Sequence, residues 1–139
     1  MIRIDSEQLG ALEIPEQALV DFPSGIPGFP AARQYCVLEL KPGSRFKLLQ
    51  CADDPKLAFV VTDPLVLDPG YPLDRVQRLA APLGIEPDEP LAAACIVTVH
   101  PRPRPPTANM LAPLAMGLRT RVGGQVVLHD SAYRVRHEM

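Results

Sequence analysis

Residues 107–116 read TANMLAPLAM, and two positions in this stretch limit the folds that are open to the chain. The apolar side chains suit a buried strand or a short core helix, whereas Asn109 and Pro113 suit neither. A buried amide needs hydrogen-bond partners, and a proline inside an element removes a backbone donor. In a β-rich domain, proline fits a strand only at an edge or a bulge. We therefore predict that Pro113 bends a strand and that Asn109 satisfies backbone groups in the adjoining loop; recognition of a partner by Asn109 is the alternative.

The other prolines favour a β-rich fold as well. The 139 residues include 17 prolines, which interrupt long helices and favour short strands joined by tight turns. Apolar runs bounded by Gly, Pro or Asp predict the strands. These runs are Ile2–Ile4, Ala11–Ile14, Tyr35–Leu40, Phe46–Cys51, Leu57–Thr62 and Leu91–Val99.

One helix and one hairpin complete the local pattern. Apolar residues between Leu73 and Leu83 recur every three to four positions, which predicts a short helix with Asp74 as its cap. Gly123-Gly124 separates two strand-like runs, 118–122 and 125–129, and so predicts a hairpin with a two-residue turn at positive φ.

Residues 22–30, FPSGIPGFP, cannot form a central strand because three prolines and two glycines interrupt them. We expect an irregular loop, sharply turned at Pro27 and Gly28, that is attached to the core by the side chains of Phe22, Ile26 and Phe29. Together with the strands, this predicts a mostly β fold: a single small β-barrel-like or sandwich domain, residues 1–139, with one short helix.

Composition indicates a globular protein without charge-driven binding to nucleic acid or membranes. Hydrophobic residues make up 47% of the chain, and the formal net charge is −2. The N-terminus lacks the apolar core of a signal peptide, and no apolar run is long enough to span a bilayer, so we expect a cytoplasmic protein. Three widely spaced cysteines, Cys36, Cys51 and Cys95, lack metal-ligand spacing and are expected to be small buried side chains.

The sequence contains no convincing catalytic, cofactor or metal site. His129-Asp130-Ser131 holds the residue types of a triad, but adjacent residues on an extended chain point to different faces, so a turn is expected. Asp53-Asp54-Pro55 is interpreted as a solvated turn rather than an acid–base pair. The glycines of residues 22–30 lack the Lys-Ser/Thr and the helix of a phosphate loop. We therefore expect no catalytic residue, no cofactor and no metal, and a binding protein rather than a small hydrolase.

Several motifs, read in order, resemble one known family. They are FPSGIPGF (22–29), LQCADDPKLAFVVTDP (49–64), GIEP (84–87), TANMLAPL (107–114), GQVVL (124–128) and DSAYRVRH (130–137). Together they resemble the FliW flagellar assembly factors over almost the whole chain. The patterns F-P-x-G-x-P-G-F, D-D-P-x-L-A-F and T-A-N-x-L-A-P are specific in combination, although each is weak alone.

The resemblance implies a small, non-catalytic β-barrel-like protein that controls flagellin synthesis. Members of the family bind the translational repressor CsrA away from its RNA-contacting surface, which relieves the repression of flagellin mRNA. They also bind flagellin near its C-terminal end, so that surplus flagellin sequesters the factor. By resemblance we expect CsrA and flagellin as partners, no direct nucleic-acid or membrane partner, and a monomer when free.

The contact residues are predicted from charge and apolar character. We expect Asp53, Asp54 and Asp63 to provide charge complementarity to the basic repressor, and Phe59 and Tyr71 to act as apolar anchors. Where relatives often carry acidic residues before the T-A-N motif, this chain has HPRPR, residues 100–104. If an acidic surface there helps relatives to hold the repressor, this chain must use other residues or bind more weakly.

Direct RNA binding by a small β-barrel is the alternative function. Such a module would display aromatic side chains on a basic face. Only 5% of the residues are aromatic and the net charge is negative, so composition counts against this alternative.

Overall fold

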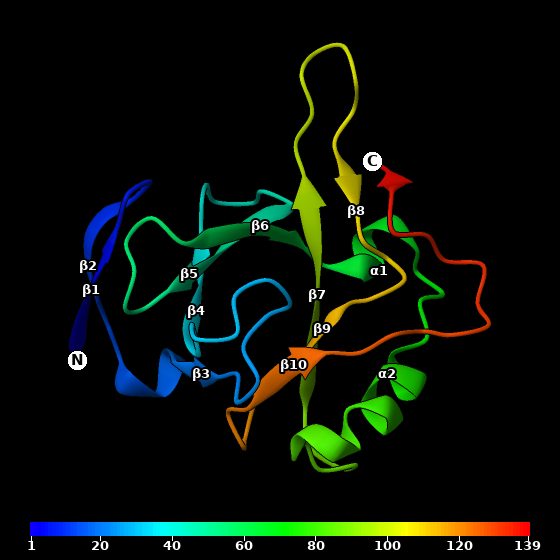
Figure 1. Ribbon diagram of the computed structural model, residues 1–139, viewed down its shortest axis with the longest axis horizontal. Helices are drawn as coiled ribbons and strands as arrows, with labels where there is room; N and C mark the ends of the chain where they lie inside the picture. The colour runs from blue at the N-terminus through cyan, green and yellow to red at the C-terminus, as the bar shows by residue number, and fades with distance from the viewer.

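The computed structural model describes all residues, 1–139, and is mostly β, as predicted (Figure 1). It contains two short α-helices rather than one, α1 (Pro64–Leu67) and α2 (Leu73–Leu79), and the 3₁₀ turns η1 (Glu16–Ala18) and η2 (Ala81–Leu83). The strands are β1 (Ile2–Ser6), β2 (Gly10–Ile14), β3 (Val20–Asp21), β4 (Gln34–Glu39), β5 (Phe46–Cys51), β6 (Ala58–Thr62), β7 (Leu91–Thr98), β8 (Thr107–Ala108), β9 (Leu114–Gly117), β10 (Gly123–Gln125) and β11 (His137–Glu138).

The main sheet curls until its two ends nearly meet. Its antiparallel strands run in the order β10-β9-β7-β6-β5-β4-β3, and β8 and β11 extend it beside β7. At the ends of this path, Asp21 of β3 forms an isolated parallel bridge with Val122, and the Asp21 N–H donates to the Arg121 carbonyl at 2.8 Å. The sheet is therefore barrel-like, with its seam held by a bridge rather than by a full ladder.

Alternate residues of the curled sheet enter different core clusters. Tyr35 of β4 packs with residues of five other strands and with the 22–30 loop, whereas the next residue, Cys36, packs beneath the β1–β2 hairpin. A third cluster lies between the sheet, α2 and the C-terminal segment. The cysteines Cys36, Cys51 and Cys95 are buried and unpaired, as expected.

The bend in the sheet lies within TANMLAPLAM. Both β8 and β9 pair with β7, with Ala108 opposite Val97 and Leu114 opposite Ala94. Residues 94–97 of β7 therefore lie opposite residues 108–114, a segment with three more residues. The extra residues do not pair with β7 and form a bulge. Pro113 stands at its end, where its carbonyl accepts from the Val126 N–H at 3.0 Å. Pro113 therefore lies at a bulge, one of the two positions that a proline can occupy in a sheet.

Asn109 ties the bulge together with its side chain. Its Oδ1 accepts a hydrogen bond from the Ala112 N–H at 3.0 Å, and its own N–H donates to the Ile96 carbonyl at 2.9 Å. Asn109 is only partly buried. The predicted hydrogen bond between the Asn109 side chain and the local backbone is therefore present. It uses the side-chain oxygen of Asn109 and not its NH₂ group.

The predicted turn at Gly123-Gly124 is wrong. The connection between β9 and β10 is the segment 118–121, in which Arg121 has φ 63°. The two glycines lie inside β10, opposite Met116 and Ala115. A Cβ on Gly123 would lie 2.8 Å from Phe22 Cζ, and one on Gly124 would lie 2.7 Å from Leu83 Cδ2. Close packing, not positive φ, explains these glycines.

The 22–30 loop covers one core cluster, but it uses two of its predicted anchors rather than three. Phe22 and Ile26 are buried, whereas Phe29 is 43% exposed. Pro27 and Gly28 occupy the centre of a tight turn, in which the Phe29 N–H donates to the Ile26 carbonyl at 2.7 Å and Gly28 has φ 93°. This is the turn that proline followed by glycine favours.

The helices begin differently from the prediction. Pro72 precedes α2, and Asp74 lies in its first turn without capping it. An aspartate does cap α1: Asp63 Oδ1 accepts from the Leu65 N–H at 2.9 Å, and Pro64 is the first residue of the helix. Gly84, with φ 98°, ends η2. Neither α-helix, nor any other helix of the chain, is long and apolar enough to cross a membrane.

Candidate protein-binding surface

The turn between β5 and β6 presents two predicted contact residues to solvent. Asp53 and Asp54 are both exposed. Asp54 Oδ1 accepts from the Lys56 N–H at 3.0 Å, whereas Asp53 forms no hydrogen bond or ion pair. The turn lies beside the β1–β2 hairpin, because the Glu7 N–H donates to the Pro55 carbonyl at 2.8 Å.

Gln50, which was not predicted to matter, holds this turn from below. It is fully buried, and its Nε2 lies within hydrogen-bond distance of the carbonyls of Cys51 (3.1 Å), Asp54 (3.0 Å) and Leu57 (3.1 Å). These contacts fix the backbone of the turn, so the carboxylates of Asp53 and Asp54 are presented from an ordered base. A glutamine in a strand followed by an Asp-Asp-Pro turn is the only sequence signal for this role.

An aromatic pair adjoins the charged turn. Phe59 is partly buried and packs edge-to-face against the more exposed Phe29, with 5.5 Å between ring centroids. Tyr35 lies 6.1 Å from Phe59. Burial, and to a lesser extent Cys51 and Asp54, raise the pKa of Tyr35 to about 12. Phe59 thus lies on β6, the strand that follows the Asp53-Asp54 turn, and Phe29 joins it from the 22–30 loop.

The other two predicted contact residues lie elsewhere. Asp63 is exposed at the opposite end of β6, about 16 Å of extended strand from the Asp53-Asp54 turn. Tyr71 is only 4% exposed and donates its hydroxyl to the Met110 carbonyl at 2.6 Å. Burial raises the pKa of this hydroxyl above its ordinary value. Tyr71 is therefore a core residue that stabilises the bulge, and it has no exposed face with which to anchor a partner.

A shallow apolar groove opens between strands that are distant in sequence. It encloses about 290 Å³ and is lined by side chains from β4, β5, β6, β7 and β9 and the residue after it, among them Val37, Lys47, Ala92, Ala93, Met116 and Leu118. Val37 is 40% and Leu118 is 55% exposed. The groove forms because the curled sheet brings these strands side by side, so it could not be predicted from the local sequence.

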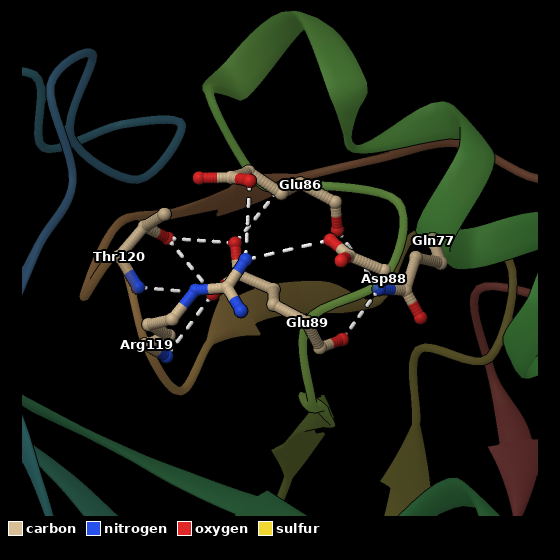
Figure 2. A network of polar contacts seen from close by, with 6 residues as sticks. All are labelled: Gln77, Glu86, Asp88, Glu89, Arg119 and Thr120. Carbon is tan, nitrogen blue, oxygen red and sulfur yellow. Dashed lines mark hydrogen bonds and ion pairs between the residues drawn. The ribbon is translucent and has the colours of Figure 1, made fainter.

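A buried carboxylate organises the β9–β10 turn (Figure 2). Glu89 is 2% exposed, and its carboxylate accepts from the N–H groups of Glu86 (2.7 Å), Arg119 (3.0 Å) and Thr120 (2.9 Å). The Thr120 hydroxyl donates to it as well, at 3.0 Å. Gln77 of α2 closes the network by donating to the carbonyls of Glu86 and Glu89.

Burial raises the pKa of the Glu89 carboxyl, but the hydrogen bonds from Thr120, Glu86 and Arg119 lower it more, from an ordinary 4.5 to about 2. The Arg119 guanidinium pairs with two exposed carboxylates instead, Glu86 at 3.1 Å and Asp88 at 3.4 Å. Every acceptor of Glu89 is therefore used within the chain, which makes it a structural carboxylate rather than a general base.

The chemistry-bearing motifs have structural roles. Ser131 Oγ donates to the Leu128 carbonyl at 2.7 Å, and Asp130 has φ 57°, so His129-Asp130-Ser131 forms the predicted turn. No group of three or more His, Cys, Asp or Glu side chains is arranged to hold a metal ion. The arrangement consists of exposed charges on ordered turns and an apolar groove, which are features suited to contact with another protein.

Comparison with known proteins agrees with this architecture. The FliW protein family model matches residues 3–139. The chain is 34% identical to the flagellar assembly factor FliW of Bacillus subtilis, over 96% of this chain and 94% of the relative. It is 32% identical to that of Moorella thermoacetica, over 99% of this chain and 88% of the relative. A crystal structure of the flagellar assembly factor FliW superposes with a TM-score of 0.86 at 32% identity, covering 99% of this chain and 96% of that one. The chain belongs to the FliW family.

Proposed function

We propose that this chain is a non-enzymatic, cytoplasmic flagellar assembly factor that binds CsrA and flagellin. In this scheme it binds CsrA away from the RNA site and so relieves repression of flagellin translation. Flagellin competes for the factor, so that translation of flagellin follows the supply of unassembled subunits. Neither association needs a metal or nucleotide, and the free factor is a monomer.

The observation that carries the proposal is the match along the full length of the chain to FliW proteins. The family model covers residues 3–139, and the superposed crystal structure covers 99% of this chain. A match restricted to one short segment would give much weaker support for a shared function. The relatives are flagellar assembly factors, and the choice of CsrA and flagellin follows from the family resemblance of the motifs.

The surface that best fits a basic partner is the Asp53-Asp54 turn with the neighbouring Phe29–Phe59 pair. The carboxylates are exposed and their backbone is fixed by Gln50. An exposed aromatic edge beside fixed charges combines apolar contact with electrostatic steering. This arrangement suits a protein surface better than RNA, because the two carboxylates repel phosphates.

Size-exclusion chromatography tests the proposal with three separate mixtures: the chain with CsrA, with flagellin, or with flagellin leader RNA. We expect co-elution with each protein and none with the RNA. Adding flagellin to the CsrA complex is expected to release CsrA. A stable complex of all three proteins would contradict competition, and co-elution with RNA alone would favour the direct RNA-binding alternative.

A further inference from the structure

A proline-rich arm connects β7 to β8 and projects away from the body of the molecule (Figure 1). Its residues, 99–106, read VHPRPRPP, and the segment from Pro101 to Pro105 is exposed throughout. The Arg104 N–H donates to the Pro101 carbonyl at 3.0 Å, which turns the tip. Four prolines restrict the backbone, so the arm loses little conformational entropy when a ligand binds.

The two arginines of the arm have no partner within the chain. Arg102 and Arg104 are exposed, and neither takes part in any of the ion pairs of the structure. At the base of the arm, Arg136 of the C-terminal segment is also exposed and unpaired. Glu138, on the adjoining strand β11, forms no ion pair with any of the three arginines.

A pocket lies at the base of the arm, beside β11. It encloses about 290 Å³, and its lining includes His100, Thr107, Asn109 and Arg136. The His100 ring nitrogen Nε2 lies 3.0 Å from Thr107 Oγ1. Because Asn109 Oδ1 already accepts from the Ala112 N–H, the Asn109 group left for a ligand is its NH₂ donor. The lining thus offers an amide donor, a guanidinium and an imidazole, the groups that bind a carboxylate.

The charge of the whole chain is unevenly divided, and the arm lies in its basic part. Residues 1–70 contain six Lys and Arg against ten Asp and Glu, whereas residues 71–139 contain eight against six. The backbone of the Asp53-Asp54 turn lies beside the N-terminal hairpin, away from the arm (Figure 1). The chain therefore carries a local basic surface on an acidic protein.

We propose that the arm and the pocket at its base form a binding site for an acidic, extended peptide segment of a partner protein. One carboxylate of the segment occupies the pocket between Asn109 and Arg136, and further carboxylates pair with Arg102 and Arg104. A bidentate pairing of guanidinium with carboxylate gives such a contact its direction. The site goes beyond the proposed function and does not depend on it.

A peptide fits this site better than RNA for two reasons. The arm and the lining of the pocket contain no Phe, Tyr or Trp side chain, so the site lacks the large aromatic rings on which successive single-stranded bases usually stack. The acidic remainder of the chain repels a long polyanion, whereas a short acidic segment meets only the local arginines.

Fluorescence anisotropy with the full chain tests the proposal. The probes are a labelled oligoglutamate of about ten residues and a labelled oligouridylate RNA of equal length. The Arg102→Ala/Arg104→Ala variant is compared with Arg33→Ala/Arg78→Ala, which removes the same charge from exposed, unpaired arginines outside the arm. We expect roughly a tenfold weaker oligoglutamate affinity for the arm variant and less than a twofold change for the control.

Asn109→Asp tests the pocket separately from the fold. It keeps an oxygen for the Ala112 N–H but replaces the free amide donor by a carboxylate, so oligoglutamate binding is expected to be lost while the melting temperature is kept. Equal weakening by the arm and control variants would show a non-specific charge effect and overturn the proposal. So would an absence of oligoglutamate binding to the unmodified chain, or tighter RNA binding that the arm substitutions abolish.

Discussion

Removing the Asn109 side chain takes away the acceptor for the Ala112 N–H, a bond of 3.0 Å inside the bulge. We expect Asn109→Ala to lower the free energy of unfolding by about 1 kcal/mol, because this partly buried donor loses its partner. Urea denaturation measures the loss, with Asn109→Asp as the matched variant that keeps an acceptor. CsrA binding, measured well below the melting temperature, is expected to stay the same. Unchanged stability of Asn109→Ala together with lost CsrA binding would show instead that Asn109 recognises this partner.

Glu89 gives the fold a specific dependence on acid. Its pKa is lowered to about 2 in the folded chain, so its stabilising contribution is complete above its ordinary pKa of 4.5 and disappears as the pH falls towards 2. We expect Glu89→Gln to lower the melting temperature by several degrees at pH 7, and the gap to the unmodified chain to close between pH 4.5 and 2. Glu86→Gln, an exposed position, is the control. A gap that stays constant across this range would refute the assignment.

At the scale of elements, the seam of the sheet depends on the absence of side chains at Gly123 and Gly124 of β10. Gly123→Ala places a Cβ 2.8 Å from the Phe22 ring and 3.1 Å from the Ala115 carbonyl, neither of which can move freely. Gly124→Ala meets only the tip of Leu83, at 2.7 Å. We expect Gly123→Ala to cost about 1–3 kcal/mol of stability and Gly124→Ala less. Thermal unfolding measures both, and Gly124→Ala/Leu83→Ala should remove the clash at Gly124. The opposite order of the two variants would contradict this account.

The same strand shows which elements can be predicted from sequence and which cannot. Strands β4, β5, β6 and β7 follow local alternation and punctuation by turns, so they lie within a residue or so of their predicted bounds. Gly123-Gly124 has the local appearance of a turn, but its cause is contact with Phe22 and Leu83, which are far away in sequence. The burial of Tyr71 and the shape of the apolar groove could not be predicted from local sequence either, because both depend on how the sheet curls.

At the scale of the whole molecule, the two candidate surfaces differ in charge and position. The Asp53-Asp54 turn lies beside the N-terminal hairpin, whereas the arginine arm projects between β7 and β8 (Figure 1). The Asp53-Asp54 turn and the arginines of the arm could both be located from sequence, because an Asp-Asp-Pro turn and the run HPRPR are local features. The arm's pocket needs β8 and β11 side by side, a pairing that joins His137 to Ala108. Two surfaces of opposite charge allow partners of opposite charge to bind without sharing contacts.

Reversing the acidic turn tests whether the proposed CsrA contact uses this surface. Asp53→Lys/Asp54→Lys changes two exposed side chains, so we expect the free energy of unfolding to move by less than about 0.5 kcal/mol. CsrA binding is expected to weaken strongly at low salt and less at high salt, because charge complementarity is screened by ions. Asp74→Lys/Glu138→Lys makes the same change of net charge at exposed, unpaired positions elsewhere. Isothermal titration calorimetry at two ionic strengths compares the variants. If both double variants lose affinity equally, CsrA responds to the net charge of the chain and not to this turn; if neither does, the contact lies on another face.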